Sequence, residues 1–147
     1  MLVRLTKPTG QKSRKRKGGA VLETCLLLPT LIMLGFGVVD YGYCIYLTNL
    51  FQGAAEAGAR VAILDTSANS DVTTAVTNAL TAGGISSSKY TITLSPSNIS
   101  GLAAGTSITV TVSGTWGNLG TQILSTSFGG MASTKTISGA SSMVKEQ

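Results

Sequence analysis

Side chains able to perform chemistry are few and widely spaced in this sequence. Histidine, the commonest general base and metal ligand, is missing altogether. The sequence also has no phosphate-binding loop, no serine-hydrolase elbow and no paired-cysteine redox motif. Among the six acids the one close pair is Asp65 and Asp71, which we interpret as a turn and helix-cap pair rather than a catalytic dyad. We therefore expect no catalytic residue, no metal site and no cofactor.

One acid has an unusual neighbourhood. Glu23 directly precedes a run without any charge from Thr24 to Val39. An ionised carboxylate inside an apolar membrane helix costs several kcal/mol unless it is paired. Two interpretations follow. Glu23 is paired with a positive group, or it sits at the membrane interface and reaches water.

A long helix must position this glutamate. We predict one helix over residues 19–64, with a membrane span at about 21–47. Residues 24–39 rise about 24 Å as a helix, less than a hydrocarbon core of roughly 30 Å, so the span includes an acid near an interface. Three tyrosines indicate its far end as an aromatic belt: Tyr41, Tyr43 and Tyr46. Pro29 removes a backbone donor and predicts a kink or local melting between Cys25 and Pro29.

Beyond the span the predicted helix becomes amphipathic. Its polar face carries Asn49, Gln52, Glu56 and Arg60, and its apolar face carries Leu47, Leu50, Phe51, Ala54, Gly58 and Val61. Glu56 and Arg60 have the spacing of a favourable ion pair. The small-residue spacings Gly53/Ala57 and Ala54/Gly58 allow close helix packing. They fit equally well a bundle with other subunits and packing against the chain's own head.

Charge is concentrated before the span. Seven of the eleven bases precede Gly18, and the remainder of the chain has four bases and six acids. Basic flanks of a membrane segment stay in the cytoplasm, which favours membrane topology over nucleic-acid binding as the role of the basic leader, residues 1–18. We expect a cytoplasmic N-terminus and an extracytoplasmic body. Gly18 and Gly19 should break the helix and leave an exposed boundary suited to proteolysis.

The two cysteines are nineteen positions apart on one predicted helix. Cys25 and Cys44 would then be about 28 Å apart along its axis, whereas a disulfide needs Cα atoms within about 7 Å. They cannot pair within one chain. An interchain bridge at Cys44 is a minor alternative to two small apolar side chains in a helix.

Residues 65–147 predict a small α+β head. Ser70 is the expected cap and Asp71 the first turn of a short amphipathic helix, which Gly83 and Gly84 end. Alternation predicts strands that bury Tyr90, Ile92 and Leu94, then Ile108, Val110 and Val112. Trp116, Leu119, Ile123 and Leu124 suit a covering loop or helical turn, and a weak strand runs from Ala132 to about Met143. We expect a three- or four-stranded antiparallel sheet with one wet face.

Several of these residues together closely resemble the TadE-like family of the tight-adherence (Flp) pilus system. The resemblance covers about residues 18–64 and rests on Gly18, Glu23, Pro29, Gly37, Asp40, Gly42, Ala54, Ala55, Gly58, Ala59, Arg60 and Ala62. Thr24 departs from it, because the family usually has an aromatic residue there.

The resemblance implies a bacterial minor pseudopilin, structural rather than catalytic, in the inner membrane and with incorporation into a pilus as a further expectation. It implies cleavage between Gly18 and Gly19 by a prepilin peptidase, with Glu23 used in helix docking. The implied partners are the membrane, other pilin subunits, the peptidase and the pilus assembly platform. Two rival hypotheses are an uncleaved single-pass anchor that displays a small binding domain, and a nucleic-acid binder that uses the basic leader.

Overall fold

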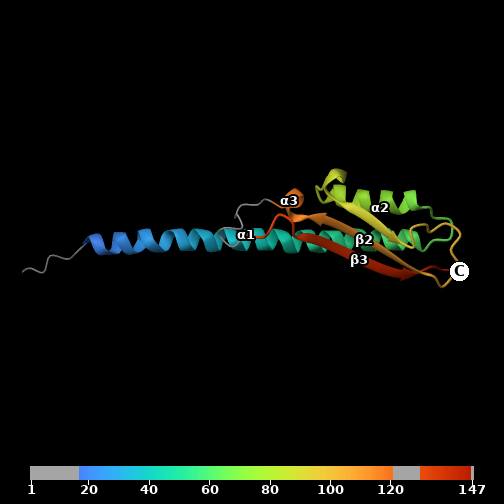
Figure 1. Ribbon diagram of the computed structural model, residues 1–147, viewed down its shortest axis with the longest axis horizontal. Helices are drawn as coiled ribbons and strands as arrows, with labels where there is room; N and C mark the ends of the chain where they lie inside the picture. Colours follow the sequence, from blue (N-terminus) through green and yellow to red (C-terminus); the bar gives the residue numbers. More distant parts are fainter. Residues whose placement is uncertain (1–16, 121–129, 147) are drawn as a thin grey trace, which may run out of the picture. The chain divides into compact units, whose positions relative to one another are not determined.

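A computed structural model describes residues 17–120 and 130–146. The chain divides into two compact units, residues 1–32 and 33–147. Helix α1 (Lys17–Ala62) contributes to both units, and every other described element belongs to the second (Figure 1). The architecture is the predicted one, a long apolar helix followed by a small α+β head. Of the predicted covering residues, Ile123 and Leu124 lie outside the described part.

One local expectation for α1 is wrong, and a second is wrong in part. The helix begins at Lys17, so Gly18 and Gly19 lie inside its first turn instead of breaking it. Glycine is tolerated there because the first backbone amides of a helix have no partner within the helix in any case. The helix also continues through Pro29 without interruption, so local melting is absent there, while the kink stays a prediction. Proline removes a single backbone donor, and the flanking turns keep their own hydrogen bonds.

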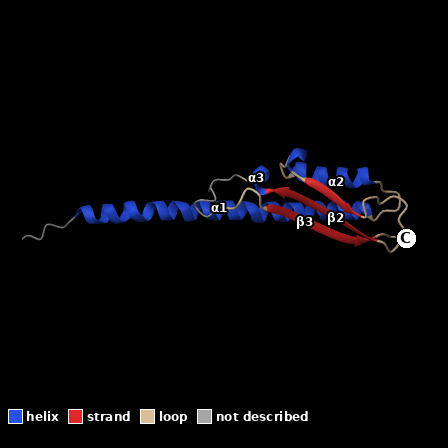
Figure 2. Cartoon of the chain, viewed as in Figure 1, coloured by secondary structure: helices blue, strands red, loops and turns tan. Residues whose placement is uncertain are grey.

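The head contains one antiparallel sheet of three strands, in the order β1-β2-β3 (Figure 2). They are β1 (Thr91–Ser95), β2 (Ser107–Thr115) and β3 (Thr136–Val144). Val110 of the central strand lies opposite Leu94 of β1 and Ser141 of β3. The predicted strands are confirmed, although β3 begins four residues later than Ala132. The opposite face of the sheet carries mainly serine and threonine and is the expected wet face.

One face of the sheet packs on two helices. Ile108, Val110 and Val112 are fully buried in β2, as their alternation predicted. They share one core with α1 and with α2 (Asn69–Ala82), whose buried stripe is Val72, Val76 and Leu80.

The N-terminal cap of α2 differs from the prediction. The cap residue is Ala68 and not Ser70. The carboxylate of Asp71 accepts a hydrogen bond of 2.9 Å from the Ala68 amide. A first-turn acid can therefore satisfy the free amide at a helix start when the cap residue has no polar side chain.

A tight corner closes one end of the core. It consists of η1 (Ser87–Lys89), before β1, and of α3 (Trp116–Leu119), after β2. The fully buried Trp116 packs with its ring centroid 6.1 Å from that of Tyr43 on α1. The backbone amide of Trp116 donates a hydrogen bond of 2.7 Å to the carbonyl of Lys135. These contacts hold both ends of the β2–β3 connection against the helix.

Candidate membrane and assembly helix

The N-terminal part of α1 is an uncovered apolar helix. Every side chain from Gly19 to Phe36 is exposed, and Leu22 and Leu26 are 74% and 78% accessible. Water-soluble proteins rarely expose a contiguous apolar surface of this extent. Among the described residues, α1 is the one helix long and apolar enough to cross a membrane.

Two polar side chains lie near the start of this segment. The hydroxyl of Thr24 donates to the carbonyl of Ala20 at 2.8 Å, so its polarity is satisfied within the helix. Glu23 is exposed, and no ion pair of this carboxylate occurs among the side chains that the structure describes. This position is compatible both with pairing of Glu23 to a positive group and with contact of Glu23 with water at a membrane interface.

Burial on α1 begins at Asp40, whose side chain is only 3% exposed. Leu47 and Phe51, about two and three turns further along the same face, are fully buried in the head core. Asp40 also lines an open pocket of about 580 Å³ together with Gly37, Cys44 and Lys135. The backbone at Gly42, in contrast, has open space where a side chain would project. Two residues of the family resemblance, Asp40 and Gly42, therefore lie on different sides of the helix, Asp40 on the covered side and Gly42 on the open side.

The three tyrosines of the predicted belt differ in exposure, although the rings of Tyr43 and Tyr46 stack with centroids 5.9 Å apart. Tyr41 is 66% exposed and Tyr46 is 48% exposed, as an interfacial position requires. Tyr43 turns inward and packs on Trp116. The hydroxyl of Tyr46 donates to the carbonyl of Gly83 at 3.3 Å, which ties α1 to the end of α2.

The helix-packing motif packs on the chain's own head. Four of its members are buried: Ala54, Ala55, Gly58 and Ala59. A Cβ at Gly58 would lie 2.5 Å from Cγ2 of Val76, so α2 needs a glycine there. At these four positions the small residues pack against the chain's own head, whereas Gly53 is exposed and has open space where a side chain would project. The predicted pair of Arg60 and Glu56 is also present, and both side chains are exposed.

A contact at the edge of the sheet was not predicted. The Gln52 side-chain amide donates to the Ala140 carbonyl at 2.9 Å and accepts from the Ala140 amide at 3.1 Å. This α1 side chain therefore replaces a neighbouring strand along β3. The approach is close, because a Cβ at Gly139 would lie 2.3 Å from the backbone nitrogen of Gln52. Glycine inside a predicted strand was the available signal, since it often marks such an approach.

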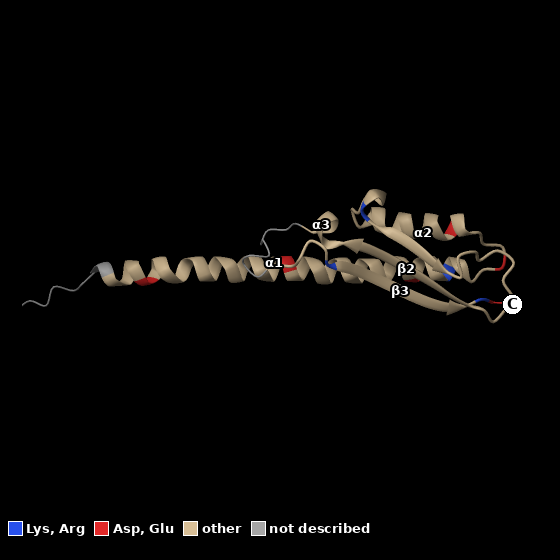
Figure 3. Cartoon of the chain, in the orientation of Figure 1, with Lys and Arg blue, Asp and Glu red and all other residues tan. Residues whose placement is uncertain are grey.

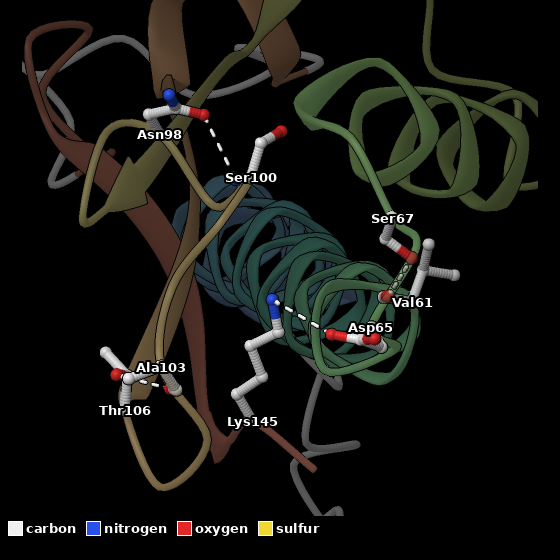
Figure 4. A network of polar contacts seen from close by, with 8 residues as sticks. All are labelled: Val61, Asp65, Ser67, Asn98, Ser100, Ala103, Thr106 and Lys145. Atoms are coloured by element: carbon white, nitrogen blue, oxygen red, sulfur yellow. Dashed lines mark hydrogen bonds and ion pairs between the residues drawn. The ribbon is translucent and has the colours of Figure 1, made fainter. Parts of the chain in front are cut away.

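The end of the head where α1 terminates holds a small polar network (Figure 4). Lys145 is almost completely buried and its ammonium group lies 3.8 Å from a carboxylate oxygen of the exposed Asp65. The Ser67 hydroxyl donates to the Val61 carbonyl at 2.7 Å, in the last turn of α1. Asp71 thus contributes to the cap of α2, whereas the carboxylate of Asp65 pairs with Lys145.

Nothing in the described residues forms a metal-binding cluster of three or more histidine, cysteine or acidic side chains. Cys25 is exposed and Cys44 half-buried, and both are free thiols on α1. The part of the chain that distinguishes this protein is therefore α1 itself.

Comparison with known proteins gives one result for this helix. The model of the family described as TadE-like protein matches residues 18–60. No curated protein and no solved structure has a significant match to the chain. The matched segment runs from the expected processing glycine through the uncovered apolar part of α1 to Arg60 in the head. Over this segment the chain is similar to the TadE-like family.

Proposed function

We propose that this chain is a minor pseudopilin that takes part in assembly of tight-adherence pili, with a structural and not a catalytic role. One observation carries the proposal: the family match begins at Gly18 and contains the uncovered apolar segment of α1. A pseudopilin needs such a helix twice, as a membrane anchor before assembly and as a packing element afterwards. The proposed partners are other pilin subunits, a prepilin peptidase and the inner-membrane assembly platform.

Residues 19–39 form the proposed membrane span. They rise about 31 Å as a helix, which matches a hydrocarbon core of roughly 30 Å. The span ends where the head begins to bury α1, at Asp40. A shorter span than 21–47 is favoured because the polar head could not enter lipid together with Leu47 and Phe51.

The seven bases before Gly18 orient the proposed anchor with its N-terminus in the cytoplasm. Enzyme reporters fused after Asp71 test this orientation. An alkaline phosphatase fusion, which folds only outside the cytoplasm, should be active, and a β-galactosidase fusion at the same position should be inactive. The reverse pattern would overturn the orientation.

Processing is the second step of the proposal. Hydrolysis of the bond between Gly18 and Gly19 leaves a carboxylate on Gly18 and a new α-amino group on Gly19, with Glu23 as the fifth residue of the mature chain. A protease needs this bond in an extended form. Because the bond lies in the first turn of α1, only the end of the helix must unwind, and two glycines lower the cost of unwinding.

The new amino group is the proposed partner of Glu23. An isolated carboxylate in the bilayer is costly, and pairing with the α-amino group of a neighbouring subunit would remove that cost and fix the register of two helices. The open side of the helix at Gly42 gives a neighbouring helix room to approach.

Two substitutions separate processing from docking. Gly18→Leu should leave a chain that still begins at Met1, because the bulky side chain obstructs the scissile bond. Glu23→Ala should still be cleaved to a large extent but should assemble poorly. Mass spectrometry of the N-terminus and a count of surface pili read the two steps separately. A wild-type chain that keeps residues 1–18 in cells producing pili would exclude this processing site.

An uncleaved single-pass anchor with a displayed head is the second candidate. It is favoured by the helical state of the Gly18–Gly19 bond and by Thr24 at a position where the family usually has an aromatic residue. Under this alternative, deletion of the peptidase gene would leave both the mass and the membrane location of the chain unchanged. Under the proposed function the same deletion would increase the mass by that of the leader.

A further inference from the structure

The exposed charges of the second unit are unequally distributed between its ends (Figure 3). The end with the polar network has the acids Asp65, Asp71 and Glu146, the buried base Lys145, and the exposed Arg60, which is paired with Glu56. The other end, which follows the proposed span along the chain, has two exposed lysines, Lys89 and Lys135. Neither lysine makes an ion pair with any side chain in the described ranges 17–120 and 130–146.

Both lysines lie on the corner that holds Trp116 against α1. The Lys135 carbonyl accepts the 2.7 Å hydrogen bond from Trp116, and the Lys89 carbonyl lies 2.8 Å from where a Cβ of Gly114 would be. Trp116 in turn packs on Tyr43. The corner is therefore level with the part of α1 that directly follows residues 19–39. We call Lys89, Lys135 and the exposed Tyr41 the proximal end.

One acid lies at this end. Asp40 lines the same pocket as Lys135 and is 3% exposed, so its carboxylate adds little to the accessible surface on which the lysines lie. Tyr41 lines this pocket too and is 66% exposed. A tyrosine that shares a pocket with an exposed lysine is a side-chain combination that favours the headgroup layer of a membrane.

We propose that the proximal end binds anionic lipid headgroups and thereby holds the head against the membrane that α1 crosses. This inference rests on the proposed function, because it needs α1 to be inserted in a bilayer. Attachment to the span keeps the lysines close to the lipid, so no free binding partner has to be captured. Each lysine near an anionic surface contributes about a fivefold change in the bound population, and the two together about 30-fold.

The full chain in lipid nanodiscs provides the test. Amide hydrogen exchange is compared between discs of phosphatidylcholine and discs that contain one quarter phosphatidylglycerol. Peptides covering residues 86–95 and 130–137 should exchange more slowly on the anionic discs, and residues 63–72 should not change. Added salt should remove the difference, since it screens the lysines.

Matched variants separate charge from structure. Lys89→Gln with Lys135→Gln should reduce the docked-to-free ratio about 30-fold and abolish the lipid dependence. Lys89→Arg with Lys135→Arg should preserve it, and so should Arg60→Gln, which removes one base elsewhere. Unchanged exchange of residues 107–115 shows that each variant is folded.

Three results would overturn the inference. The first is equal exchange on neutral and anionic discs. The second is loss of protection in the arginine variant, which would indicate a structural role of the lysines. The third is protection that requires two copies per disc and extends to residues 63–72, which would identify the acidic end of a second copy as the partner. If the chain does not enter nanodiscs at all, both the proposed membrane function and this inference are wrong. If it enters the discs but shows no dependence on anionic lipid, only this inference is wrong.

Discussion

Helix α1 contains two stretches that differ in polar pattern and in surroundings. Residues 19–39 carry a single charged side chain, Glu23, whereas residues 40–62 carry polar side chains along one face. The apolar side chains of the first stretch are exposed, whereas the second stretch supplies much of the head core. The comparison shows that the period of the polar residues decides which face of an apolar helix is buried, because a polar stripe leaves room for only one buried face.

The largest expected effect comes from the two phenylalanines of α1. Phe51→Ala should lower the free energy of unfolding of the head by about 3–5 kcal/mol, since it empties a fully buried site. Phe36→Ala, at a side chain that is 45% exposed, should change it by less than about 0.5 kcal/mol. Urea unfolding in detergent micelles, followed through the single, buried Trp116, measures both. Equal losses would mean that the two stretches are packed alike.

A smaller effect is expected at two glycines of the family motif. Gly58→Ala should destabilise the head by about 1–3 kcal/mol, because its Cβ would overlap Cγ2 of Val76. Gly42→Ala meets open space and should leave head stability unchanged or raise it by up to about 1 kcal/mol. Adding Val76→Ala should relieve part of the Gly58→Ala loss, and a double-mutant cycle measures that relief. Strict additivity would contradict the contact.

Gln52 tests whether α1 completes the sheet. Gln52→Ala removes two hydrogen bonds to the backbone of Ala140 and should cost about 1–2 kcal/mol. Asn49→Ala, on the same polar face, is the control and should cost little. Amide exchange at Ala140 should increase in the Gln52 variant only. A variant that unfolds normally but retains slow exchange at Ala140 would show that another group covers this edge.

The smallest expected effect belongs to the exposed ion pair of α1. Arg60→Gln should reduce stability by about 0.3–0.5 kcal/mol at low salt, and the loss should vanish at high salt. The same unfolding assay, repeated at two ionic strengths, measures it. A loss larger than about 1 kcal/mol would assign Arg60 a further contact beyond Glu56.

Local patterns were sufficient to predict the helices and strands, and the candidate membrane helix. The charge-free run before Asp40, the change to an amphipathic period and the alternation in β2 each reflect residues close in sequence. The hydropathy of a segment and the spacing of its apolar residues depend only on residues close in sequence. One chain segment is therefore enough to predict whether it forms a helix or a strand. For the same reason the polar face of α1 and the short amphipathic helix α2 were predicted correctly. The family resemblance also rests on one continuous segment.

Contacts between distant segments were decided only by the tertiary structure. Gln52 meets Ala140 across 88 residues, and Lys145 becomes buried beside Asp65 although lysine is usually exposed. Gly58 appeared equally suited to another subunit and to its own head until Val76 was placed against it. The cap of α2 belongs to the same group, since it depends on where the chain turns after α1. Sequence patterns state which side chains need a partner, and only the packed chain determines which partner they obtain, because many apolar or polar neighbours satisfy the same local requirement.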